Sequence, residues 1–253
     1  MADDPDRRPR SAIGSSTRDS ITLAGRDLPS EIMGRLSLTD LTYVLLVGRD
    51  PSPGERRLLD TVLVSLADHG LTPSALATRL TWTGAPEAIQ GAVAAGLLGA
   101  GSVFLGPAGD TAVFLAEALA AHEGAELPDV AREAVAARMA EGLRVPGLGH
   151  PVHRDEDPRT PRLYALAEEE GLLGPHARLL LLVAQAHEEA SGKRLPVNGA
   201  GAAGAVLVDI GIRPDVVRGV VLIARTAGLV AHLAEEMDHP LGRDLWLDVE
   251  RGG

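Results

Sequence analysis

The residues most suited to catalysis or ligand binding lie in one turn, Pro146–Arg159, whose sequence is PGLGHPVHRDEDPR. Two glycines and three prolines constrain this turn around His150, a side chain that can gain or lose a proton near neutral pH. Arg154 and Arg159 follow closely. Because guanidinium groups pair well with carboxylates and phosphates, the turn predicts an anion-binding site beside an imidazole.

Two other interpretations of this turn stay open. A metal site would use His150, His153 and Asp157, but no helix sets their spacing and no supporting carboxylates are evident elsewhere, so a metal is the weaker option. A solvated polar loop with one structural histidine would need no ligand.

A second charged position is Arg225, in the middle of an apolar stretch that predicts a long helix over Asp215–Glu236. An arginine there is costly unless an anion or a carboxylate meets it. Gly228 and His232 follow at spacings of three and four, so we expect all three residues to face one cavity. A buried ion pair with an internal Asp or Glu explains Arg225 equally well.

Other catalytic motifs find little support. The GAGAAG sequence of residues 199–204 matches the dinucleotide-binding fingerprint, but the segment before it is too short for a buried strand, so helix-packing glycines are the better interpretation. The chain has no Gly-x-Ser-x-Gly nucleophile elbow. Its single lysine, Lys193, lies beside a glycine in a predicted loop, which disfavours a Schiff-base mechanism.

Composition narrows the class of protein. The chain has 253 residues, of which 45% are hydrophobic and 23% charged, as in a folded protein of one or two domains. Aromatic residues are only 2%, which favours close helix packing. A net charge of -11 opposes binding to nucleic acid or to an anionic membrane. Without cysteines, an apolar leader or an uninterrupted apolar span, the sequence predicts a cytoplasmic protein.

The sequence predicts that the secondary structure around these residues is helical throughout. Residues 1–20 show no apolar period and predict a flexible tail. Ser37 and Asp40 resemble a capping box before an apolar helix. Ala85–Gly101 is so apolar and glycine-rich that we expect a buried helix there, packed closely on another. Further helices are predicted at Glu55–His69, Thr111–Glu123, Asp129–Glu141, Thr160–Glu170 and Pro175–Ser191.

Three separate motifs together resemble the citrate synthase superfamily in their order and spacing. They are the opening segment Leu36–Arg49, the turn Gly147–Arg159 and the helix around Ala224–His232. The resemblance covers residues 21–253. In its short length and its apolar residue at Leu105, the chain is most similar to the citryl-CoA lyase branch, which includes the C-terminal module of ATP-citrate lyase.

This resemblance implies an all-α fold with two subdomains. The large helical subdomain would comprise about residues 21–108 and 210–253, with a smaller one inserted at about 109–209. The resemblance also implies a homodimer. A cleft between the subdomains would bind a CoA thioester and a dicarboxylate or tricarboxylate.

Particular residues match the family's functional positions. His150 would hydrogen-bond the oxaloacetate carbonyl, or take the tertiary hydroxyl proton of the citryl group in the cleavage direction. Arg159 and Arg225 would bind carboxylates, and Arg144 and Arg154 would lie near the CoA nucleotide. The resemblance implies no metal and no covalently bound cofactor, because coenzyme A enters as part of the substrate.

Two departures from the family pattern stand out. Leu105 replaces the histidine that steadies the acetyl-CoA enol in citrate synthases, and Ala200 replaces the catalytic aspartate. The resemblance still implies a citryl-CoA lyase-like enzyme that cleaves or forms a carbon-carbon bond to give acetyl-CoA and oxaloacetate. The alternatives are a lyase or synthase for another 3-hydroxyacyl-CoA, or a catalytically weak homologue that binds CoA or a tricarboxylate.

Overall fold

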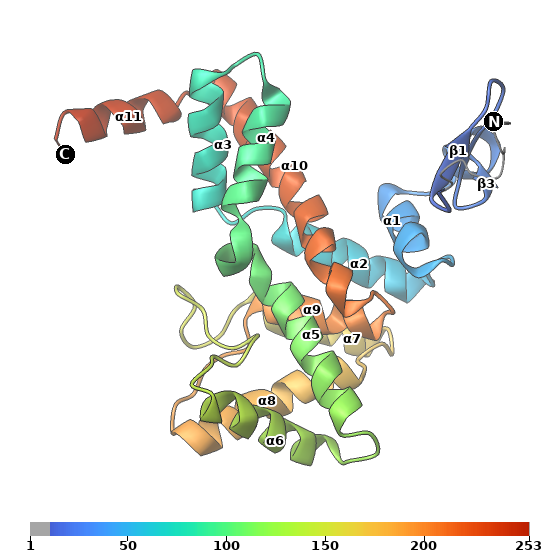
Figure 1. The fold of residues 1–253 in the computed structure, drawn as a ribbon, viewed down its shortest axis with the longest axis vertical. Coiled ribbons are helices and arrows are strands. Elements are labelled where there is room, and N and C mark those ends of the chain that lie inside the picture. The colour runs from blue at the N-terminus through green and yellow to red at the C-terminus, as the bar shows by residue number, and fades with distance from the viewer. Residues whose placement is uncertain (1–10, 253) are drawn as a thin grey trace, which may run out of the picture.

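The computed structural model describes residues 11–252, which form a mostly helical fold and confirm the predicted fold class (Figure 1). The helices are α1 (Leu38–Val47), α2 (Pro53–Leu66), α3 (Pro73–Gly84), α4 (Ile89–Gly99), α5 (Gly106–Ala121), α6 (Leu127–Ala140), α7 (Arg159–Glu169), α8 (Pro175–Ser191), α9 (Gly199–Asp209), α10 (Val217–Asp238) and α11 (Gly242–Glu250). Short π-helical turns, η2 (Leu28–Ile32) and η3 (Gly101–Leu105), and a 3-10 turn, η4 (Pro214–Val216), complete the helical elements described.

The N-terminal part differs from the prediction. Strands β1 (Gly14–Ser16), β2 (Ile21–Leu23) and β3 (Arg26–Asp27) form a small antiparallel sheet at one end of the molecule (Figure 1). The predicted flexible tail over residues 1–20 is therefore wrong at β1, whereas residues 1–10 lie outside the described part. Strands of two or three residues are too short to show the alternation of apolar and polar residues that marks a strand in the sequence.

Most predicted helices are confirmed, and local capping explains their starts. The Ser37 hydroxyl accepts a hydrogen bond from the Asp40 amide, and the Asp40 carboxylate accepts one from the Ser37 amide, as the capping box predicts. Gly48 ends α1 at φ +84°, a conformation that favours glycine. The prediction missed α3 and α11, although Thr72 caps α3 and a proline opens it. It indicated α9 only through its helix-packing glycines and gave no range for that helix.

The glycines of α9 allow three segments to approach closely. A Cβ added at Gly201 would lie 2.5 Å from the Gly147 Cα, and one added at Gly204 would lie 2.2 Å from the Ala108 carbonyl oxygen. The GAGAAG sequence is therefore a packing surface at the start of a helix, as predicted. These contacts hold α9 against α5 and against the turn that carries His150.

Helix α4 is less buried than expected. Ala92 and Gly96 face α3 and α10, and a Cβ at Gly96 would collide with Thr78. On its outer side, Leu98 is 83% exposed, and the following η3 turn leaves Val103 75% exposed. Close packing is thus observed on one face only, and the other is an apolar surface.

Two segments, Gly101–Ala121 and Pro214–Asp238, are long and apolar enough to cross a membrane by length and composition. Both contribute buried residues to the hydrophobic core, including Leu115 and Val220. Core helices of globular proteins meet the same criterion, so these segments give only weak evidence for a membrane span.

Candidate functional site

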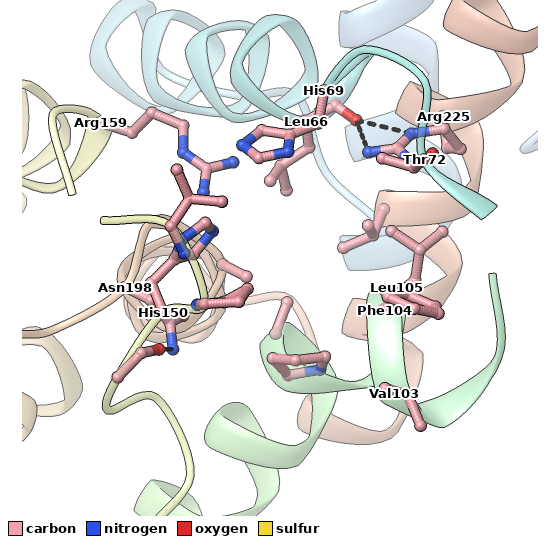
Figure 2. A pocket seen from close by; sticks show the side chains of 17 residues that line it. Leu66, His69, Thr72, Val103, Phe104, Leu105, His150, Arg159, Asn198 and Arg225 are labelled. Carbon is pink, nitrogen blue, oxygen red and sulfur yellow. Dashed lines mark hydrogen bonds between the residues drawn. The ribbon is translucent and has the colours of Figure 1, made fainter. Parts of the chain in front are cut away.

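A cavity of about 280 Å³ lies between the end of α2, η3, the start of α5, the Pro146–Arg159 turn, α9 and α10 (Figure 2). It brings together three of the predicted site residues, His150, Arg159 and Arg225. The other polar residues that line it are His69, Thr72 and Asn198. The apolar lining comes from Leu66, Val103, Phe104, Leu105, Pro107, Ala108, Pro151, Val152, Ala200 and Val221, with Gly149.

The ring of His150 is fixed by its own turn. Its Nδ1 accepts hydrogen bonds from the backbone amides of Val152 and His153, at 3.1 and 3.0 Å. The neutral imidazole therefore carries its proton on Nε2. Burial is the main cause that lowers the pKa of His150. Neutral His150 thus offers the cavity a hydrogen-bond donor, which corrects the predicted role as acceptor of the hydroxyl proton.

Arg159 is oriented by a buried carboxylate. Asp157 accepts hydrogen bonds from the Arg159 Nε at 3.0 Å and Nη2 at 2.7 Å, and from the amide of Gly199 at 2.7 Å. Burial raises the pKa of Asp157, but these hydrogen bonds hold it well below its usual range. Asp157 therefore stays ionised and keeps Arg159 at the cavity, where the guanidinium can meet an anion.

Arg225 has no carboxylate partner among the described residues. Its Nε and Nη2 donate to the Leu66 carbonyl oxygen at 3.4 and 3.3 Å, and the residue is only 6% exposed. Burial lowers its pKa. The alternative of an internal ion pair is therefore wrong for this arginine, and a buried cation at a cavity wall favours an anionic ligand.

The sequence analysis missed His69, which follows α2 and lines the cavity. Its ring lies edge-on to His150 with 5.6 Å between centroids. Burial, followed by the charge of Arg159, lowers the pKa of His69. The sequence predicts His69 only as the last residue of a helix before Gly70, because no spacing motif marks it as functional.

Three histidines, His69, His150 and His153, place ring nitrogens within 4.8 Å of one another. That spacing could hold a metal ion, but the donor set does not fit one. A metal on the Nε2 of His150 would require a proton on its Nδ1, which already faces two amide donors. The neighbouring Arg159 also disfavours a cation, and Asp157, the other predicted ligand, is occupied by Arg159.

The predicted grouping of Arg225, Gly228 and His232 on one cavity wall is correct only for Arg225. A Cβ at Gly228 would lie 2.0 Å from the Ala67 carbonyl oxygen, so backbone already occupies the space beside this glycine. The Nε2 of His232 lies 2.9 Å from the Asp68 carboxylate. Through Gly228 and His232, this face of α10 packs against the chain segment that ends in His69.

A buried charge cluster stabilises this contact between α10 and the segment before His69. The guanidinium of Arg79, 2% exposed, contacts the Nδ1 of His232 at 3.0 Å and the carboxylate of Glu236 at 2.8 Å, and also pairs with Glu235. Because Arg79 donates to Nδ1, the other nitrogen of His232 donates to Asp68. A second hollow borders this cluster but shares no residue with the cavity around His150.

The opposite wall of the cavity is apolar. Leu105 and Ala200 both line it, at the positions where the sequence departs from the family pattern. None of the described lining residues is an aspartate or a glutamate. Arg144 and Arg154 are exposed and do not line this cavity, so their contact with a CoA nucleotide stays a prediction.

Asn198 connects the two halves of the site. Its Oδ1 accepts from the Gly201 amide at 2.8 Å, which caps α9, and its Nδ2 donates to the Gly149 carbonyl oxygen at 2.9 Å. The side chain is thus used in positioning the His150 turn against Ala200.

The chain is similar to known proteins over most of its length. The family model "Citrate synthase, C-terminal domain" matches residues 24–245. A citryl-CoA lyase structure from Hydrogenobacter thermophilus is 31% identical, has a TM-score of 0.83, and the match covers 92% of this chain and 88% of that one. The citrate synthase of Acidithiobacillus ferridurans is 29% identical over 205 residues, which are 76% of this chain and 50% of that protein.

A more distant structure shares the fold. ATP citrate lyase from Methanothrix soehngenii, solved with citrate and coenzyme A, has a TM-score of 0.74 at 19% identity, with 92% of this chain and 40% of that chain covered. The chain spans about half the length of the curated relatives it matches.

Proposed function

Because this chain belongs to the citrate synthase family, we propose that it cleaves or forms the carbon-carbon bond of a citryl-CoA-type thioester, giving acetyl-CoA and oxaloacetate in the lyase direction. The observation that carries this proposal is the cavity itself. Arg225, which is buried without a carboxylate partner, shares its wall with Arg159 and His150. Carboxylates are the ligands that such a wall favours.

Each polar group has a defined task in this reaction. Arg159 and Arg225 bind carboxylates of the substrate and fix the bond that breaks. The Nε2–H of His150 donates a hydrogen bond to the tertiary oxygen and stabilises the negative charge that develops on it. The apolar wall around Leu105 receives the thioester arm.

Arg144 and Arg154 bind the nucleotide part of coenzyme A in this proposal, because exposed arginines can reach phosphates outside the cavity. We also propose a homodimer, in which the exposed apolar side of α4 and η3 is covered by a second copy. Light scattering at micromolar concentration should give about twice the chain mass, whereas a monomer would contradict this arrangement.

Turnover tests the activity directly. We expect release of acetyl-CoA from citryl-CoA, measured against a small panel of 3-hydroxy-3-carboxyacyl-CoA thioesters. Cleavage of another panel member alone would assign the enzyme to a different 3-hydroxyacyl-CoA. Tight binding of CoA or citrate without turnover would instead identify a binding homologue, a second candidate that the alanine at position 200 favours.

A further inference from the structure

Thr72 lines the cavity but has no task in the proposed reaction. It immediately precedes α3, and its Oγ1 accepts a hydrogen bond from the Ala75 amide at 3.3 Å, which caps this helix. A threonine hydroxyl can also donate one hydrogen bond. Within residues 11–252, no acceptor takes the proton of Thr72, so this donor is available to a ligand.

The packing of α3 against α10 determines where Thr72 lies relative to Arg225. The two helices pack side by side and run in the same direction, toward the start of α11 (Figure 1). Arg79 of α3 contacts His232 of α10. Seven positions earlier in each segment, which is about two helical turns, stand Thr72 and Arg225. The same register therefore brings Thr72 and Arg225 together at the cavity, and Figure 2 shows both side chains at the same end of it.

The two side chains offer complementary donors to one anion. Arg225 is 6% exposed and donates only to the Leu66 carbonyl oxygen within the described chain, so its remaining N–H groups are available to a ligand. Thr72 adds a hydroxyl donor, and the N-terminus of α3 adds the positive end of a helix dipole. A carboxylate has two oxygens and can accept hydrogen bonds from both side chains at once.

We propose that Thr72 is a substrate-binding residue, whose hydroxyl donates a hydrogen bond to the carboxylate that Arg225 binds. This inference rests on the proposed function, because it requires a citryl-type ligand in the cavity. It divides the polar wall between two tasks. Thr72 and Arg225 bind a carboxylate, whereas His150 binds the tertiary oxygen.

The helix cap orients the hydroxyl before the ligand arrives. The branched Cβ of threonine restricts its χ1 angle, and the hydrogen bond from the Ala75 amide holds Oγ1 at the N-terminus of α3. Pro73, the first residue of the helix, restricts the backbone at the same point. Only the O–H bond of Thr72 is left to rotate toward an acceptor. Binding therefore costs little side-chain entropy, which favours affinity.

The test is calorimetric titration of the full chain with citrate and with tricarballylate, which keeps the carboxylates of citrate but lacks the tertiary hydroxyl. Thr72→Val removes the hydroxyl with little change in shape, and Thr72→Ser keeps it. We expect Thr72→Val to weaken both ligands by about tenfold to a hundredfold, and Thr72→Ser to bind them as the wild type does. The loss should be equal for the two ligands, because the contact is to a carboxylate.

Loss of the α3 cap is a second way in which Thr72→Val could weaken binding, so two further variants separate the causes. Ser37→Ala removes the cap of α1, which does not line the cavity, and should lower the melting temperature without changing the Kd for citrate. Thr72→Asp keeps a good cap but places a carboxylate beside the bound one. It should not lower the melting temperature, yet it should abolish citrate binding because like charges repel.

Two results would overturn this inference while citryl-CoA cleavage by the wild type leaves the proposed function standing. Citrate affinity within twofold of the wild type in Thr72→Val or in Thr72→Asp would remove Thr72 from the binding site. Weaker binding of citrate with unchanged binding of tricarballylate would assign the hydroxyl to the tertiary oxygen. If the wild type cleaves citryl-CoA but binds no free citrate, the KM for citryl-CoA gives the same ratio for Thr72→Val. A wild type that binds neither ligand and cleaves no member of the thioester panel overturns both proposals.

Discussion

Two buried arginines, Arg79 on α3 and Arg225 on α10, differ in what neutralises them. Arg79 is 2% exposed and pairs with Glu236 at 2.8 Å, with Glu235 and with His232. Arg225 is 6% exposed and meets only the Leu66 carbonyl oxygen within the described chain. A buried charge with its own counterions stabilises the fold, whereas a buried charge without them favours an anionic ligand.

The two arginines are also connected. Arg225 contacts Leu66 at the end of α2, and the Arg79 cluster reaches Asp68 through His232. Between them, α10 fixes the backbone just before His69. The structural cluster around Arg79 therefore positions one wall of the binding cavity.

The largest expected effect is on stability when Arg79 is changed. Arg79→Met removes the counterion of Glu236, whose side chain is only 2% exposed, and should lower the free energy of unfolding by about 3–5 kcal/mol. Urea denaturation measures this change. Arg132→Met is the matched control, because its pair with Asp129 is exposed and should contribute about 1 kcal/mol or less. Equal effects of the two substitutions would contradict a structural role for Arg79.

Arg225→Leu should show the opposite pattern. Loss of its charged hydrogen bonds should weaken citrate binding by about 1.5–3 kcal/mol, while the melting temperature stays unchanged or rises because a buried unpaired charge is removed. Calorimetric titration with citrate and thermal unfolding of the same sample separate the two effects. If Arg225→Leu unfolds the protein while His150→Ala leaves turnover intact, the site has been misplaced.

A new carboxylate at position 200 should change catalysis more modestly. Ala200→Asp places an acid on the apolar wall, in the first turn of α9, where the helix N-terminus favours negative charge. We expect Ala200→Asp to raise citryl-CoA cleavage tenfold or more above the wild-type rate.

The room for this carboxylate comes from the cavity, because the Cβ positions of Gly199 and Gly201 are already filled by Arg159 and Gly147. Steady-state rates and deuterium exchange into the acetyl methyl group check the outcome. A lower rate with unchanged exchange would mean that the carboxylate blocks the substrate.

The sequence predicted the helical fold and three of the polar cavity residues because their signals are local. Capping residues, apolar periodicity and a constrained Gly-Pro turn act over a few positions. The cluster around Arg79 escaped prediction because its hydrogen bonds join residues 153 to 164 positions apart along the chain. His69 escaped prediction because its neighbour in the cavity, His150, belongs to a distant segment of the chain. Equally, no local signal showed that Gly228 meets backbone rather than a ligand.

The pH dependence of stability should change least, and it reports on the two cavity histidines. Burial lowers the pKa values of His69 and His150 below their ordinary value of 6.5. Just below pH 6.5 the unfolded chain therefore binds more protons than the folded one, so the free energy of unfolding falls as the pH is lowered. Citrate should reduce this loss, because an anion in the cavity favours the protonated rings.

Urea midpoints between about pH 5 and 8, with and without citrate, measure this dependence in the wild type and in a His69→Gln/His150→Gln double variant. The buried carboxylate of Glu236 titrates in a separate window. Burial raises its pKa, but hydrogen bonds from Arg79 and from the amides of Gly242 and Leu241 lower it below 4.5, so its contribution is lost only in more acidic solution. In the double variant, the free energy of unfolding should no longer change with pH near pH 6, but it should still fall in more acidic solution. An unchanged slope near pH 6 would show that these two rings do not set it.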